Sequence, residues 1–181
     1  MEIQFTIHRR EEILAGLANA FREVNDFSAQ LTQEQFVWKP GPKWSIAEHL
    51  DHLIRSTKGL ASALKMPKIA IRAFGIPNRP SREFKGLVDR YHSMLRGGLV
   101  ASGPYVPEKD AQFAQDKMLA NWTMIGHKFD ERLKNWSEKN LDHYLLPHPA
   151  LGKLTIREMM FFTIYHNYHH LRAMKELWSA Y

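Results

Sequence analysis

The sequence predicts an all-α protein: a four-helix bundle with a long, partly irregular excursion between its second and third helices. Apolar residues recur at spacings of three and four along four long stretches, as in helices that bury one face. Two Ser/Thr-x-x-Glu sequences, Ser45–Glu48 and Thr155–Glu158, are capping boxes that mark the starts of the second and fourth helices. No strand pattern of any length is found. The length suits one domain that covers residues 1–181.

The first helix is expected from Arg9 to about Leu31. A stripe of apolar residues defines its buried face: Ile13, Leu14, Leu17, Phe21, Val24 and Phe27. The sequence Lys39-Pro40-Gly41-Pro42 then breaks the chain, because proline removes a backbone donor and glycine disfavours helix. The second helix is expected to begin at Ser45 and to end before Pro67.

The excursion covers residues 68–107. It is rich in proline and glycine and contains one short helical candidate, from about Ser81 to Leu95. Such a segment is often a plain connection, but one of this length can also cover the mouth of a site. The third helix is expected from about Glu108 to Ser137, and the fourth from Thr155 to about Trp178.

The composition limits the metal ligands and the partners that are expected for this protein. The chain has no cysteine, so a metal ion would have to be bound by His, Asp or Glu. The absence of cysteine also favours a cytoplasmic protein. The charged start is unlike a secretion signal, and the lack of a long apolar run indicates no membrane partner. The net charge is +6, yet the basic residues are scattered, with no run longer than Arg9-Arg10. A nucleic-acid partner is therefore not expected, whereas an anionic small-molecule substrate is compatible with this charge.

Three of the ten histidines lie in Tyr165–His170 (YHNYHH). His166 and His170 are four residues apart on the predicted fourth helix, the separation that two ligands of one metal ion need. On a helical wheel His170 lies in the inward stripe, His166 lies at its edge, and His169 points towards solvent. An H-x-x-x-H pair is weak evidence alone, because core or surface histidines explain it equally well.

The second helix offers a partner for this pair. Beside its apolar stripe runs a row of small and polar residues that suits a cavity lining: Ser45, His49, His52, Ser56, Gly59 and Ala63. Either His49 or His52 could face the fourth helix, and the wheel slightly favours His49. Three neutral imidazoles suit zinc, nickel, iron or another late divalent ion. Three protein ligands also leave a coordination position open, as in catalytic sites.

Three segments in order resemble the DinB-like superfamily of metal-binding four-helix bundles. Trp44–Leu53 (WSIAEHLDHL) is similar to its second-helix motif, and His148–Glu158 (HPALGKLTIRE) to its run into the last helix. Tyr165–His170 resembles its terminal H-x-x-x-H. The order, the separations and the length agree, so the resemblance covers nearly the whole chain.

Carried over by position, the metal ligands of the superfamily fall on His52, His166 and His170. The resemblance thus selects His52, where the wheel favours His49. The implied cofactor is a divalent metal ion, zinc or nickel, with iron or manganese as alternatives. Many members follow the last histidine with Arg-Gly-Gln, whereas this chain has Leu171-Arg172-Ala173. That departure leaves the substrate class open but does not affect the three histidines.

Characterised relatives are often S-transferases or isomerases that use low-molecular-weight thiols such as bacillithiol or mycothiol. Others have been described as metal-dependent hydrolases. The resemblance therefore implies a metal-dependent enzyme acting on a small molecule, with thiol transfer as the first hypothesis and hydrolysis as the alternative. Arg55 and Arg172 are candidates to hold a carboxylate of the thiol. A non-enzymatic bundle that binds a metal or small ligand, or forms a homodimer, is the hypothesis from another class. The sequence assigns no catalytic acid or base.

Overall fold

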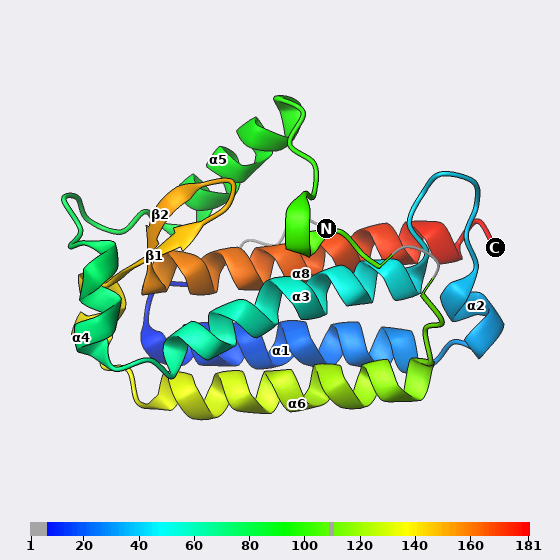
Figure 1. The fold of residues 1–181 in the computed structure, drawn as a ribbon, viewed down its shortest axis with the longest axis horizontal. Helices are drawn as coiled ribbons and strands as arrows, with labels where there is room; N and C mark the ends of the chain where they lie inside the picture. Colours follow the sequence, from blue (N-terminus) through cyan, green and yellow to red (C-terminus); the bar gives the residue numbers. More distant parts are fainter. Residues whose placement is uncertain (1–6, 109–110) are drawn as a thin grey trace.

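The protein is described by a computed structural model that covers residues 7–108 and 111–181. Four long helices form the bundle (Figure 1). They are α1 (Arg10–Ala29), α3 (Ile46–Leu64), α6 (Gln115–Lys134) and α8 (Ile156–Trp178). Helices α1 and α3 each pack against both α6 and α8, so the four helices enclose one core. The predicted four-helix bundle is confirmed.

The capping boxes begin α3 and α8 as the sequence predicts. The Ser45 hydroxyl accepts from the Glu48 N–H at 3.1 Å, and the Glu48 carboxylate accepts from the Ser45 N–H at 2.7 Å. The corresponding distances for Thr155 and Glu158 are 3.2 and 2.9 Å. Each box satisfies two backbone donors that have no partner within the helix, which fixes the residue at which the helix begins.

Close packing between helices holds α8 in a defined position. Gly16 of α1 leaves space for α8, because a Cβ atom there would lie 3.0 Å from the Cδ1 atom of Ile164. Between α1 and α6, the rings of Phe21 and Trp122 lie 4.5 Å apart. The indole N–H of Trp122 donates to the carbonyl oxygen of Phe21 at 3.0 Å. The position of α8, which carries two of the candidate ligands, is therefore set by the core.

The third long helix is shorter than predicted. Helix α6 covers Gln115–Lys134, whereas the expected range was Glu108–Ser137, and positions 109–110 of that range lie outside the described residues. The amide of Gln115 donates to the carbonyl oxygen of Ser28 at 2.7 Å. This bond ties the chain to the end of α1 just where α6 begins, a contact between distant segments that periodicity cannot predict.

A β-hairpin precedes α8, although no strand was predicted. Strands β1 (Leu145–His148) and β2 (Gly152–Thr155) pair antiparallel, with Leu146 opposite Leu154. Each strand has four residues, which is too short for alternation to separate a strand from a loop. Gly152 forms part of the turn with a φ of 77°, which favours glycine. Figure 1 shows the hairpin above the first turns of α8.

The excursion folds back over the bundle. Its helix α5 packs against α8, and its turn η2 packs against α3 (Figure 1). Helix α5 begins three residues later than the predicted Ser81 start. The elements of the excursion are α4 (Lys68–Ile71), η1 (Arg72–Phe74), α5 (Phe84–Arg96) and η2 (Gly103–Tyr105), and the remaining short helices are α2 (Gln33–Val37) and α7 (Glu138–His143). Within the described part of the chain, no helix is long and apolar enough to cross a membrane.

Candidate metal centre

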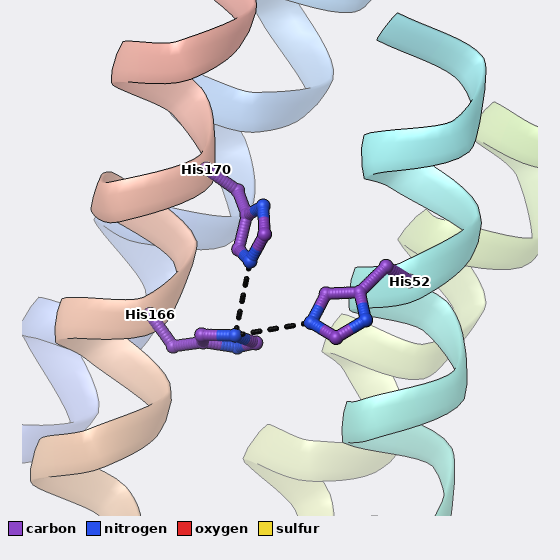
Figure 2. A group of neighbouring side chains, drawn as sticks. All are labelled: His52, His166 and His170. Atoms are coloured by element: carbon purple, nitrogen blue, oxygen red, sulfur yellow. Dashed lines mark hydrogen bonds between the residues drawn. The ribbon is translucent and has the colours of Figure 1, made fainter. Parts of the chain in front are cut away.

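Helices α3 and α8 bring three histidine rings together inside the bundle (Figure 2). The Nε2 atom of His166 lies 3.2 Å from Nε2 of His52 and 3.1 Å from Nε2 of His170. The three residues are buried, with 6–7% of their surface exposed. Among residues 7–108 and 111–181, this is the only group of three or more His, Asp or Glu side chains close enough to hold one metal ion.

The distances and the charge of these rings fit a divalent ion. Two nitrogen ligands at about 2.0–2.1 Å from one ion lie about 2.8–3.4 Å apart at octahedral to tetrahedral angles. The two Nε2–Nε2 distances around His166 fall in this range. Burial lowers the pKa of His166 and of His170 well below the ordinary value, so both rings are neutral at pH 7. A neutral imidazole is the form that binds a metal.

A backbone carbonyl fixes the orientation of His52. The Nδ1–H of His52 donates to the carbonyl oxygen of Tyr105 at 2.6 Å. This hydrogen bond places the ring proton on Nδ1 and leaves the lone pair of Nε2 directed at the other two rings. Tyr105 ends turn η2, so the excursion contributes to the site. Every residue has a backbone carbonyl group, so the sequence does not indicate which one accepts this hydrogen bond.

His49, which the helical wheel favoured as a partner of the pair, lies beside the group and not in it. Its Nδ1 atom is 2.9 Å from Nδ1 of His170. Burial lowers the pKa of His49 to about 4, so this ring is also neutral. A proton on Nδ1 of His170 can then be donated to Nδ1 of His49, which leaves Nε2 of His170 free for a ligand.

Aromatic rings enclose the three histidines. Trp44 lies 5.2 Å from His52 and is nearly parallel to His170 at 6.2 Å between ring centroids. On the other side, Phe162 stacks on His166 at 4.8 Å. These rings restrict water, which is the physical cause of the lowered pKa values. The sequence showed Trp44 only as part of a motif, and Phe162 was not singled out at all.

The other residues of YHNYHH do not join the group. His169 is half-buried, and its ring packs against Tyr91 at 5.9 Å between centroids. The hydroxyl of Tyr165 makes a hydrogen bond with Nε2 of His92. The hydroxyl of Tyr168 donates to a carboxylate oxygen of Glu23 at 2.9 Å.

Of the two arginines proposed to hold a carboxylate, one already has such partners. Arg55 contacts a carboxylate oxygen of Asp51 at 2.6 Å and one of Glu108 at 3.5 Å. Arg172 is exposed on α8 and interacts with the hydroxyl of Tyr165. Arg172 is therefore the more accessible of the two cations for a ligand.

Comparisons with known proteins agree with this fold. A search of curated proteins finds no match. Among solved structures, YfiT from Bacillus subtilis, described as "a probable metal-dependent hydrolase with an unusual four-helix bundle topology", is similar with a TM-score of 0.65. The likeness covers 98% of this chain and 90% of that chain at 13% sequence identity, which shows the fold alone. A family model described as the DinB superfamily matches residues 16–174. The chain belongs to the DinB superfamily.

Proposed function

We propose that this protein is a metal-dependent enzyme whose centre is formed by His52, His166 and His170, with zinc or nickel as the ion. The observation that carries the proposal is a group of three buried imidazoles whose possible ligand nitrogens lie within 4.8 Å of one another, with Nε2 of His166 at 3.2 and 3.1 Å from the other two Nε2 atoms. The orientation of His52 by a carbonyl and of His170 by a neighbouring imidazole supports it. A bound ion would supply positive charge and an open position at which a thiol loses its proton.

The reaction that we propose is transfer of a low-molecular-weight thiol to an electrophilic small molecule. Among the described residues, no carboxylate belongs to the three-histidine group. The two acidic residues nearest to it in the sequence are engaged elsewhere: Asp51 pairs with Arg55 at 2.6 Å, and Glu48 pairs with Lys39 at 2.5 Å. A thiol that binds the ion as a thiolate would release its proton to solvent, so no separate general base is needed. This local chemistry is compatible with thiol transfer, the first reaction that the resemblance to the superfamily implies.

Hydrolysis is the second candidate. It is favoured by the description of YfiT, whose fold is similar, as a probable metal-dependent hydrolase. The same three histidines would hold the ion in either reaction. A homodimer and a cytoplasmic location stay predictions from the sequence.

Two measurements test the proposal and separate these reactions. Elemental analysis should find stoichiometric zinc or nickel in the wild type and a large loss of metal in His170→Ala. The metal-loaded protein should then be assayed with bacillithiol, mycothiol or cysteine and a generic electrophile, and separately with an activated ester without thiol. Thiol conjugation in the wild type that is lost in His170→Ala supports transfer. Ester cleavage without thiol supports hydrolysis, and full metal content in His170→Ala contradicts the proposed centre.

A further inference from the structure

Two polar rings from outside the bundle meet at Phe162, the ring that stacks on His166. His148, the last residue of β1, packs edge-on against Phe162 at 4.3 Å between ring centroids. Tyr91 of α5 packs edge-on against the same ring at 5.2 Å, and it lies 6.2 Å from the ring of His166. The hairpin and the excursion thus each place one hydrogen-bonding side chain against Phe162, and Tyr91 also packs against the candidate ligand His166.

The turn of the hairpin decides where His148 carries its proton. The backbone N–H groups of Ala150 and Leu151 both donate to Nδ1 of His148, at 3.1 Å each. An atom that accepts two hydrogen bonds must carry a lone pair, so the proton of the neutral ring lies on Nε2. Burial lowers the pKa of His148 to about 4, which keeps the ring neutral. The Nε2–H group can therefore only donate, and it has no hydrogen-bond partner among the described residues.

Tyr91 has the same character. The residue is 6% exposed, and its hydroxyl makes no hydrogen bond with the described residues. A phenol keeps its proton at neutral pH, so the hydroxyl is available as a donor. Neither donor atom is among the fully buried polar atoms without a partner in the described part of the chain, so both can be reached by solvent or by a ligand. Two accessible donors that pack against the same ring and have no partner in the described residues are available to an acceptor atom of a ligand.

We propose that Nε2–H of His148 and the hydroxyl of Tyr91 bind an acceptor oxygen of the substrate, beside the group held by the three histidines. The inference rests on the proposed metal centre and names the substrate class, a compound with a carbonyl group such as an amide, an ester or a conjugated ketone. Both donors are uncharged, which suits a neutral carbonyl oxygen. A carboxylate or phosphate is more often bound by Arg or Lys.

The alternative is a purely structural role for His148, because its Nδ1 atom accepts the hydrogen bonds that hold the hairpin turn. Two substitutions separate these roles. Asparagine places its amide oxygen near the position of Nδ1, so His148→Asn keeps the acceptor for the turn and removes the donor. Glutamine places its amide nitrogen near the position of Nε2, so His148→Gln keeps the donor and removes the acceptor. Tyr91→Phe removes only the hydroxyl.

The test uses the full-length protein loaded with Co²⁺ and two thiol probes, mercaptoacetamide and ethanethiol. Only the first probe has a carbonyl group. Each dissociation constant is measured from the sulfur-to-cobalt absorption, and the ratio of the two constants is compared between variants, which cancels differences between the thiols themselves. The preference for mercaptoacetamide should fall about tenfold in His148→Asn, the typical contribution of one hydrogen bond, and by a smaller factor in Tyr91→Phe. It should stay near the wild-type value in His148→Gln.

The outcomes distinguish the inference from the proposed function. The inference is overturned if the preference for mercaptoacetamide is unchanged in His148→Asn, or if it is lost only in His148→Gln. In either case His148 serves only to hold the hairpin turn. If the wild type binds no Co²⁺, the metal centre fails and the inference falls with it. A measurement on the zinc-loaded wild type does not depend on the folding of any variant. The ¹⁵N resonance of the His148 Nε2–H group should shift with mercaptoacetamide and not with ethanethiol, and the absence of that difference also overturns the inference.

Discussion

Helix α8 carries two buried polar clusters that differ in how well their members satisfy one another. At its first turn, the carboxylate of Glu158 is completely buried and accepts hydrogen bonds from three directions. The donors are the guanidinium groups of Arg79 at 2.8 Å and Arg82 at 3.0 Å, and the backbone N–H groups of Arg82 and Thr155 at 2.9 Å each. Both arginines belong to the excursion, so this cluster fastens the excursion to the bundle. Its charges are paired within the protein.

The cluster in the middle of α8 is different. The Nε2 atoms of His52 and His170 each lie at hydrogen-bond distance from Nε2 of His166, and all three rings are neutral. With the protons of His52 and His170 on Nδ1, the three Nε2 atoms have at most one ring proton between them, that of His166. The next residue, Asn167, is completely buried, and neither polar atom of its amide has a partner among the described residues. Unpaired buried groups of this kind lower the stability of the fold. The first cluster thus satisfies its own polar groups, whereas the second leaves nitrogen lone pairs that the proposed metal ion would satisfy.

The strongest test of this difference between the two clusters is to remove one histidine ring from the middle cluster. His170→Ala should weaken Zn²⁺ or Ni²⁺ binding on the order of 10³-fold, because one of three ligands is lost. The affinity is measured by competition with a chromophoric chelator. Glu158→Gln is the control from the other cluster and should change the same affinity by less than about tenfold. Equal losses in the two variants would mean that the clusters do not differ in role.

Glu158→Gln should instead act on folding. The substitution removes the charge that two arginines share, and the free energy of unfolding should fall by about 2–4 kcal/mol. The value lies below that for a fully buried pair, since the arginines are partly exposed and can be rehydrated. Urea denaturation of the metal-free protein measures it. A decrease of less than about 1 kcal/mol in the free energy of unfolding would mean that the Glu158 cluster contributes little to stability, and the two clusters would then not differ in this respect.

The pH dependence of the stability difference between wild type and Glu158→Gln tests whether the charge of Glu158 is its cause. Burial alone would raise the pKa of Glu158, but the hydrogen bond from Arg79 and those from the Arg82 and Thr155 N–H groups outweigh it, so the pKa is lowered. A carboxyl group with a lowered pKa stabilises the fold above its unfolded value near 4.5, and this stability is lost as the pH falls further. The stability gap between wild type and Glu158→Gln should stay constant from neutral pH to about pH 5 and shrink below about pH 4.5. A gap that shrinks between pH 7 and 6 would point to a different group.

The same two clusters show how far sequence reasoning reaches. The start of α8 was predicted because its capping box joins residues three apart, and the pair His166 and His170 was predicted because one helical turn separates them. Local geometry decides both. The arginines that pair with Glu158 come from about eighty residues earlier in the chain, and no local pattern indicates them.

The choice between His49 and His52 needed more than the sequence pattern. The two residues lie on neighbouring positions of one stripe, and the rotation of α3 that separates them is set by packing against α6 and α8. The resemblance to the superfamily selected His52, the residue that the structure brings within 3.2 Å of His166. The carbonyl of Tyr105 and the tautomer of His148 depend on how distant or irregular segments fold, and they had no signal in the sequence.

A smaller effect is expected at His49, which orients a ring of the middle cluster without joining it. His49→Phe removes the acceptor for Nδ1 of His170 and should weaken metal binding about tenfold, as for other groups that orient a ligand. His49→Asn keeps an oxygen near the position of Nδ1 and should lose clearly less. Chelator competition at pH 7 measures both. A tenfold loss in His49→Asn as well would show that the ring matters for packing and not for its acceptor.

The smallest effect is expected at His169, which is the closest chemical match to His170 that the chain offers. It has the same side chain one residue earlier on the same helical turn, but it is half-buried and lies outside the three-histidine group. His169→Gln should therefore change metal affinity by less than about twofold, the scale of an ordinary surface substitution. The measurement is the same chelator competition, with His170→Ala as the opposite extreme. A loss in His169→Gln near that of His170→Ala would mean that metal binding follows the number of histidines on α8 and not their direction.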